Sequence, residues 1–243
     1  MGFRGVAVAV FVLTVAGCGS EDPVVDSGHP PPPERANLIS CDGRSFPPEA
    51  LKRPFVSDES DPAVVEARKN LREVMFGMQD SPLREVLREG GEVLFGVGDP
   101  KTEQGDGGAP QGQTMPYIAV RADDGRFRFA NSGGCTLRPH VEDGHEIAAW
   151  RLASAAGPDS TELDLWVNEQ TCNSGKNAEG RIDDPVVVYG PDTVTIQVTT
   201  RPRGGGQNCQ SNPDTPYRLK LQEPLGNRTL LDGGYSPPIP LTP

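Results

Sequence analysis

Apolar residues recur at intervals of three and four between residues 61 and 78, while charged residues occupy the positions between them. The apolar positions are Val64, Ala67, Leu71, Val74, Met75 and Met78. Asp61 is a good helix cap, and Pro62 suits a first helical position, so the pattern predicts an amphipathic α-helix. Ser81-Pro82 predicts a second short helical turn through Leu83, Val86 and Leu87, which Gly90-Gly91 would end.

The pattern after residue 91 changes to short stretches that are typical of β-strands. Glu92 to Val97 is short and apolar, and residues 115–121 and 126–131 flank Asp123-Asp124-Gly125, a hairpin turn by composition. In residues 126–131, two phenylalanines are expected on one face and two arginines on the other. Residues 99–113 are rich in Gly, Asp and Gln and are predicted to form a mobile loop.

Five further stretches in the second half fit the length of strands: His145 to Leu152, Glu162 to Asn168, Val186 to Tyr189, Val194 to Thr199 and Tyr217 to Leu221. Three of them alternate strictly between apolar and polar residues, which is the pattern of antiparallel strands with one buried face. Gly190-Pro191-Asp192 predicts a hairpin turn, and residues 38–55 are interpreted as an irregular segment held by Cys41.

The expected fold class is therefore α+β. An N-terminal helix with an antiparallel meander forms a lobe over residues 38–140, and a β-rich, sandwich-like or open-sheet lobe follows over residues 141–236. Residues 237–243 are expected to form a flexible tail. The pattern leaves open whether the lobes are two domains or one continuous domain.

The N-terminus has the three parts of a bacterial export signal. Arg4 supplies the positive charge, Gly5 to Leu13 form an apolar run, and Val15-Ala16-Gly17-Cys18 matches a lipobox. The run is too short for a membrane span, which needs about 20 apolar residues. The sequence predicts a signal peptide over residues 1–17 and an acylated Cys18; a plain secretory signal is the alternative. Residues 18–37 are polar and contain four consecutive prolines from Pro30, typical of an extended tether.

Four cysteines remain after Cys18, namely Cys41, Cys135, Cys172 and Cys209. An even number in an exported chain predicts two disulfides, with three possible connectivities. The pairing Cys41–Cys135 and Cys172–Cys209 is favoured because each bridge then stays within one half of the chain. No Cys-x-x-Cys pair suggests zinc or redox chemistry.

The formal net charge of −11 argues against nucleic acid as a partner, because an acidic surface repels phosphate backbones. The expected partner is instead the membrane, contacted through the N-terminal lipid anchor. The predicted location is the extracytoplasmic face of the cell membrane.

Three stretches resemble known chemistry only in part. Asn131-Ser132-Gly133-Gly134 is similar to the serine motif of chymotrypsin-type proteases, but Asn131 replaces the aspartate, and the only preceding histidine, His29, lies in the tether. The segment from His140 to His145 gathers imidazoles and carboxylates without helical metal-ligand spacing, which favours a solvated connection between lobes. Residues 204–206 are three glycines near arginines, but no Gly-Lys-Ser/Thr follows, so a phosphate loop is not supported.

The last third resembles a family of uncharacterised actinobacterial secreted proteins and lipoproteins. The matching pieces are Thr171-Cys172-Asn173-Ser174-Gly175, Glu179-Gly180-Arg181, Gly205-Gly206-Gln207-Asn208-Cys209, Asn212-Pro213-Asp214-Thr215-Pro216, Glu223-Pro224-Leu225-Gly226-Asn227-Arg228 and Leu231-Asp232-Gly233. The resemblance covers residues 172–234 and, more faintly, the regions of Cys41 and Cys135. It implies an envelope protein and supports a local Cys172–Cys209 bridge, while no catalytic residue carries over.

The leading functional hypothesis is a lipoprotein whose disulfide-bonded domain binds an envelope protein or a small ligand without catalysis. No catalytic, cofactor-binding or metal-binding residue is assigned, and no cofactor is expected. An exported hydrolase with dispersed catalytic residues is the alternative, favoured if His140 or His145 lies within hydrogen-bond distance of Ser132. A purely structural role in the envelope is the third possibility.

Overall fold

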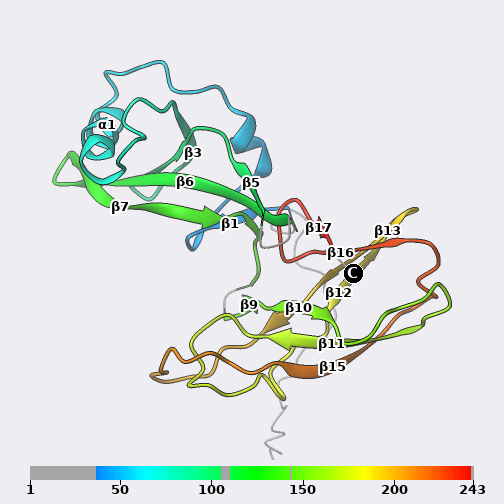
Figure 1. Ribbon diagram of the computed structural model, residues 1–243. Helices are drawn as coiled ribbons and strands as arrows, with labels where there is room; N and C mark the ends of the chain where they lie inside the picture. The colour runs from blue at the N-terminus through cyan, green and yellow to red at the C-terminus, as the bar shows by residue number, and fades with distance from the viewer. Residues whose placement is uncertain (1–36, 105–109, 143, 242–243) are drawn as a thin grey trace, which may run out of the picture. The chain divides into compact units, whose positions relative to one another are not determined.

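The computed structural model describes residues 37–104, 110–142 and 144–241 (Figure 1). The expected signal peptide, Cys18 and nearly all of the expected tether lie outside these residues. None of the helices in the described ranges has the length and apolar character needed to cross a bilayer.

The N-terminal half consists of one α-helix, one 3-10 helix and a series of strands. In chain order these are β1 (Ile39–Cys41), β2 (Arg44–Phe46), η1 (Pro48–Lys52), α1 (Pro62–Val74), β3 (Leu83–Glu89), β4 (Glu92–Val97), β5 (Lys101–Gln104), β6 (Pro110–Asp123), β7 (Arg126–Thr136) and β8 (Arg138–Pro139). Strands β3-β4-β6-β5 are paired in that order, and β7 also pairs with β6. Strands β2-β1-β8 form a separate small sheet.

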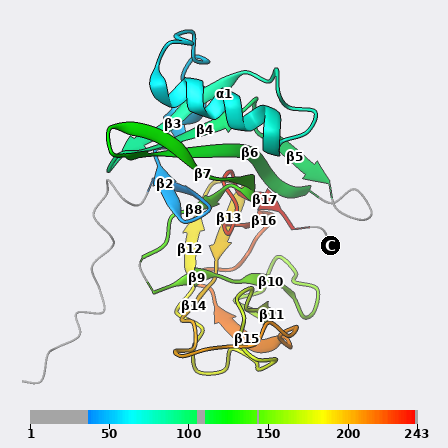
Figure 2. The same ribbon diagram turned by 90° about the vertical axis from the view of Figure 1, so that its left-hand side faces the viewer.

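The helix α1 begins where its sequence predicts. The Asp61 carboxylate accepts a hydrogen bond from the Ala63 N–H at 2.7 Å, and Pro62 occupies the first turn, where a missing N–H is tolerated. The apolar side chains of α1, among them Val64 and Leu71, face the sheet and are almost completely buried. Figure 2 shows α1 lying across this sheet.

Three tight turns set the strand pairing of this half. Asp42 and Gly43 connect β1 to β2, with φ values of 52° and 74°. Gly90 and Gly91 connect β3 to β4 with positive φ, and so do Asp124 and Gly125 between β6 and β7. A two-residue hairpin of this kind needs positive φ at both positions, which explains the Asp-Gly and Gly-Gly pairs.

Both faces of the β3-β4-β6 sheet are buried, because successive residues of a strand point to opposite sides. Val93 and Phe95 of β4 and Ile118 of β6 pack on the α1 side. Leu94 of β4 and Tyr117 of β6 pack on the other side, against Ile39, Cys41 and Phe46 from β1 and β2 and Ala50 of η1. The β1–β2 hairpin therefore covers the face that α1 leaves open.

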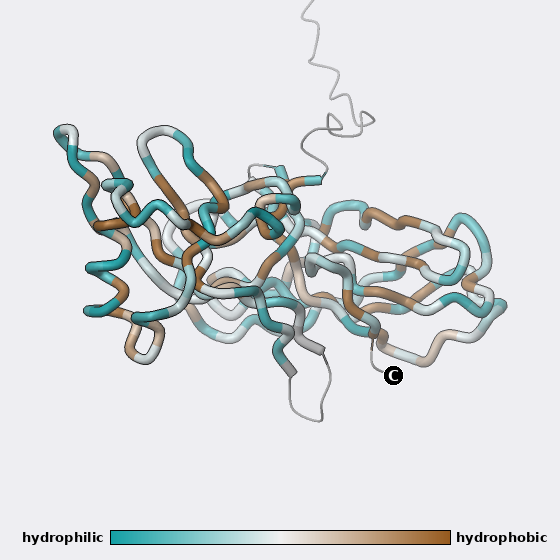
Figure 3. Tube along the Cα trace, turned by 90° about the horizontal axis from the view of Figure 1, so that it is seen from above, coloured by the Kyte–Doolittle hydropathy of each residue, from teal (hydrophilic) through white to brown (hydrophobic). Residues whose placement is uncertain are grey.

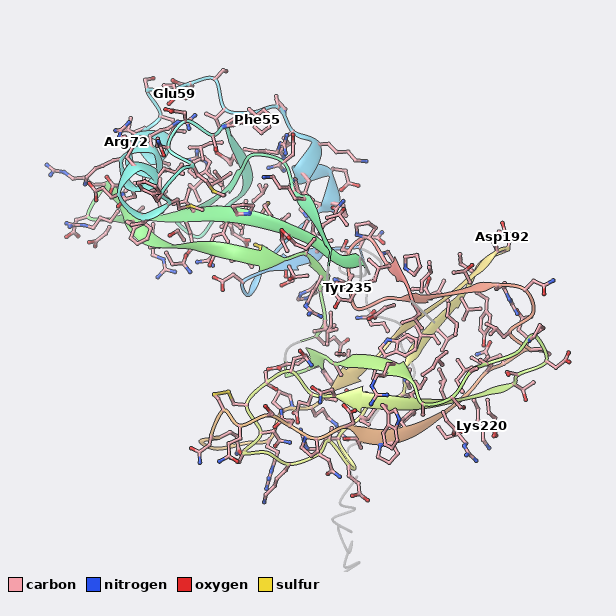
Figure 4. The ribbon with its side chains drawn as sticks, viewed as in Figure 1. Phe55, Glu59, Arg72, Asp192, Lys220 and Tyr235 are labelled. Carbon is pink, nitrogen blue, oxygen red and sulfur yellow. A yellow bond between two sulfur atoms is a disulfide. The ribbon has the colours of Figure 1, made fainter. Side chains whose placement is uncertain are left out.

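The C-terminal half contains only strands and loops among its described residues. The strands are β9 (Glu146–Ile147), β10 (Ala149–Leu152), β11 (Glu162–Asn168), β12 (Val186–Tyr189), β13 (Thr193–Gln197), β14 (Thr199–Thr200), β15 (Thr215–Lys220), β16 (Thr229–Asp232) and β17 (Ile239–Pro240). They form the sheets β10-β11-β15 and β12-β13-β16-β17 and the pair β14-β9. The predicted turn between β12 and β13 is present, with Asp192 at its tip (Figure 4).

One apolar core joins the two larger sheets of this half. Trp150, Leu165 and Leu219 come from β10, β11 and β15, while Ile196 and Leu230 come from β13 and β16. The Trp150 Nε1–H donates to the buried carboxylate of Asp232 on β16 at 3.1 Å, which ties the sheets together. The two sheets therefore share one apolar core, and Figure 3 shows apolar stretches separated by polar loops.

The predicted α+β class is nevertheless wrong, because the structure is β-rich. The described chain has a single α-helix, of 13 residues, and seventeen strands. The prediction overestimated helix because Leu83, Val86 and Leu87 were interpreted as a helical turn, whereas they lie in β3. A β-bulge at Val86 places Val86 and Leu87 on the same side of the sheet, so the spacing imitates a helix.

Three further segments are more regular than expected. Residues 237–243, predicted to be a flexible tail, contain β17, which pairs with β16. Residues 38–55, predicted to be irregular, contain β1, β2 and η1. Residues 99–113, predicted to be a mobile loop, contribute β5 and the start of β6, and only 105–109 lie outside the described residues. The polar composition hid these strands because β5 is exposed and at the edge of the sheet.

Candidate functional site

A hollow of about 460 Å³ opens on the face of the N-terminal sheet that carries the β1–β2 hairpin. Arg44 of β2, Arg121 and Asp123 of β6, and residues 128–131 of β7 line it, together with Ala122. Arg121 follows Tyr117 and Ala119 at the two-residue spacing of one strand face, and these two residues are covered by the hairpin. The hollow therefore begins where the hairpin's cover ends, towards the β6–β7 turn.

The Asp42 carboxylate is hydrogen-bonded to two residues that line the hollow, Arg44 and Asn131. Its Oδ2 atom accepts hydrogen bonds from the Tyr117 hydroxyl at 2.6 Å, from Arg44 Nη1 at 2.7 Å and from Asn131 Nδ2 at 3.0 Å. These donors, the Tyr117 hydroxyl first among them, hold the pKa of Asp42 below its usual value. Burial and the neighbouring Asp42 charge raise the pKa of Tyr117 to about 12, so this hydroxyl stays protonated.

Glu92 of β4 binds two of the arginines that line the hollow, Arg44 and Arg121. The Glu92 carboxylate accepts from Arg44 Nε and from Arg121, whose Nη2 is 2.5 Å from Glu92 Oε2. Burial opposes ionisation of Glu92, but the hydrogen bonds from Arg44 and Arg121 outweigh it, so its pKa lies below the usual value. Arg44 Nη2 also donates to Asn131 Oδ1 at 3.0 Å, which fixes its guanidinium in one orientation.

Two arginines stand directly opposite each other at the open end of the hollow. Arg121 and Arg128 are paired residues of β6 and β7, and like charges in that position destabilise a sheet. Asp123 offsets part of this repulsion through an ion pair with Arg128 at 2.8 Å. Beside them, Ala130 is the extra residue of a β-bulge, because Ala119 faces Asn131 while Val120 faces Phe129.

This arrangement offers hydrogen-bond donors, the guanidinium N–H groups, to a ligand in the hollow. Arg121 donates hydrogen bonds from Nε and Nη2 to Glu92, and Arg128 forms an ion pair with Asp123 through Nε. Within the described residues, the remaining guanidinium donors of both side chains have no protein partner. The hollow contains no nucleophile paired with a base, since its lining is arginine, aspartate, asparagine, phenylalanine and alanine.

The disulfide predictions are confirmed. Cys41 pairs with Cys135 across β1 and β7, and Cys172 pairs with Cys209 in the C-terminal half. Two disulfides indicate an oxidising, extracytoplasmic environment. Their surroundings differ: Cys41 is buried in the N-terminal core, whereas both Cys172 and Cys209 are exposed. Cys18 lies outside the described residues.

The serine and histidines that resembled catalytic residues are not joined to one another. Ser132 lies within β7 opposite Ile118, and neither histidine is hydrogen-bonded to it in the described structure. His140 Nδ1 is instead 2.9 Å from the Ser45 hydroxyl of β2, and His145 Nε2 is 3.6 Å from Asp183. The condition that would have favoured a hydrolase is therefore not met.

The glycines at 204–206 form an exposed loop in which Gly204 O accepts from Gln207 Nε2 at 3.0 Å. No helix follows this loop in the part of the chain that the structure describes, and the nearby Arg201 is engaged with Asp183 at 3.1 Å. In the same described ranges, no group of three or more His, Cys, Asp and Glu side chains is arranged to hold a metal ion.

The sequence gives only a partial signal for the arginine-lined hollow. Arg126 and Arg128 alternate with phenylalanines, which correctly indicates a polar face on β7, but Arg44 comes from a hairpin more than 70 positions earlier. Comparison with protein-family models, curated proteins and solved structures found no match to the chain.

Proposed function

We propose that the protein is a membrane-anchored extracytoplasmic lipoprotein whose β-rich domain binds a ligand without catalysing a reaction. The export signal and the lipobox at Cys18 support the anchor, and the proline-rich segment that follows supports a tether. A multiply acylated cysteine holds a protein firmly to a bilayer, because each buried CH₂ contributes about 0.8 kcal/mol.

The observation that carries the binding role is the arginine-lined hollow. Its guanidinium groups are oriented by Asp42, Glu92 and Asp123, and such pre-oriented donors reduce the ordering that a ligand must impose. The hollow lies on a disulfide-bonded sheet, since Cys135 belongs to β7 and Cys41 to β1. The resemblance of residues 172–234 to secreted proteins and lipoproteins is consistent with this role.

The anchoring part of the proposal is tested by mass analysis of the protein isolated from native membranes. We expect a tryptic peptide that begins at Cys18 and carries diacylglycerol, and we expect Cys18→Ser to release the protein from the membrane fraction. Cys172→Ser is the matched control, because it also removes a cysteine but should leave the protein membrane-bound. An unmodified Cys18 in protein recovered from the medium would contradict the proposal.

A further inference from the structure

We infer that the arginine-lined hollow is a binding site for the phosphate group of a small soluble phosphate ester. The inference rests on the proposed binding function and names its ligand class. It starts from the number of donor groups that meet there: Arg44, Arg121 and Arg128 come from three different strands and line one hollow.

The placement of Arg121 opposite Arg128 is unfavourable for folding alone. Like charges directly opposite on paired strands are destabilising, and the protein spends one carboxylate on each arginine to offset this, Glu92 on Arg121 and Asp123 on Arg128. Positions where a protein departs from a local rule are expected at functional sites. A bound anion between the two guanidinium groups would turn their repulsion into attraction.

The free donors match a phosphate better than a carboxylate. A carboxylate has two oxygens, which one guanidinium fork can satisfy, whereas a phosphate ester presents three terminal oxygens to several donors. The side chains of Arg121 and Arg128 are 64% and 65% exposed, so their remaining donors are accessible from solvent. Arg44 is only 16% exposed and forms the inner wall.

The hollow is also larger than a phosphate group alone. Its volume of about 460 Å³ falls in the range of small-molecule sites, so part of it is available to the organic portion of the ester. The bulge leaves the backbone of its extra residue, Ala130, without a ladder partner. Ala130 and Asn131 line the hollow beside the arginines and can contact that portion.

The test is a titration of the purified protein with glycerol 3-phosphate and with inorganic phosphate, followed by backbone ¹⁵N–¹H NMR at constant ionic strength. We expect saturable shifts confined to residues 121–131 and to Arg44. Acetate and chloride at equal ionic strength should produce no saturable shift. The double variant Arg121→Gln/Arg128→Gln should weaken binding at least tenfold.

The matched control is Arg218→Gln, because Arg218 is 63% exposed and ion-paired, with Asp164, on the β11–β15 pair. It should bind phosphate as the unmodified protein does. Arg128→Lys keeps the charge but removes the fork, so we expect it also to weaken binding. Shifts equal in chloride, shifts retained in the double variant, or binding only to phosphatidylglycerol vesicles would each overturn the inference. These outcomes are independent of Cys18 acylation, so failure of the site and failure of the anchor are distinguishable.

Discussion

The Glu169–Arg181 ion pair offers a sharp test of how the C-terminal half is stabilised. Glu169 follows β11, and its side chain is 1% exposed. Arg181 donates to both carboxylate oxygens, at 2.6 and 2.5 Å, and also to the carbonyl of Arg201 at 2.6 Å. The pair therefore connects three loops. We expect substitution of Arg181 and substitution of Glu169 to lower the free energy of unfolding by different amounts.

Arg181→Met removes the cation but keeps an apolar stem of similar length. It leaves the Glu169 carboxylate buried without a counter-charge, so we expect a loss of about 3–5 kcal/mol, the range for breaking a buried pair. Glu169→Gln is milder, because the amide oxygen still accepts one hydrogen bond and Arg181, 18% exposed, can turn towards water. We expect about 1–2 kcal/mol for Glu169→Gln, since one charged hydrogen bond is lost.

Urea unfolding followed by tryptophan fluorescence measures these changes, because Trp150 and Trp166 both lie in the β10-β11-β15 sheet. The double variant should be less destabilised than the sum of the single ones, giving a coupling energy of about 1–3 kcal/mol. The control cycle uses Asp164→Asn and Arg218→Met on an exposed pair, where about 0–1 kcal/mol is expected. A coupling energy no larger than the control's would refute the reasoning.

Further expectations concern the disulfides and the buried carboxylate. Cys172→Ser should destabilise the protein by about 2–5 kcal/mol, and an unchanged melting temperature under non-reducing conditions would contradict this. A mild reductant should open the exposed Cys172–Cys209 bridge before Cys41–Cys135, as mass analysis of alkylated peptides would show. Burial raises the pKa of Asp232 against the opposing hydrogen bonds from Gly234 and Trp150, so its ionisation opposes folding. Asp232→Asn should therefore become more stable relative to the unmodified protein as pH rises from about 4 through that raised pKa, in urea titrations across pH.

Strands with one buried face could be located from the sequence, and one of them with its exact bounds, although residues 217–221 proved to be Thr215–Lys220 and residues 194–199 are divided between β13 and β14. Leu163, Leu165 and Val167 alternate with polar residues, and Glu162–Asn168 is β11 as expected. Alternation of apolar and polar residues identifies the buried face of a strand directly, because successive side chains point to opposite sides. The Glu92–Val97 run was also predicted correctly, and its continuous apolar character arises because both faces of β4 are buried.

Prediction failed where long-range pairing decided the structure. The bulge at Val86 and the hairpin at Gly90-Gly91 are properties of the β3–β4 pair, and each has a local sequence that also fits the end of a helix. β16 was not predicted because its four residues are stabilised by parallel pairing with β13, more than 30 positions earlier. Parallel pairing leaves no turn signal between the strands.

The candidate site could not be predicted for the same reason, because strands far apart in the sequence bring its arginines together. The net charge of the whole chain also says little about the charge of this one site. A net charge of −11 describes the average surface, and a long polyanion must contact much of that surface, so we still expect nucleic acid to bind poorly. A small phosphate ester is different, because charges beyond about 8–10 Å are screened at physiological ionic strength. Within that distance Arg44, Arg121 and Arg128 are balanced by Asp42, Glu92 and Asp123, so the local surface lacks the excess of acids that the whole chain has. We therefore expect the inferred site to admit a single phosphate group, whereas a polyanion would meet the acidic surface around it.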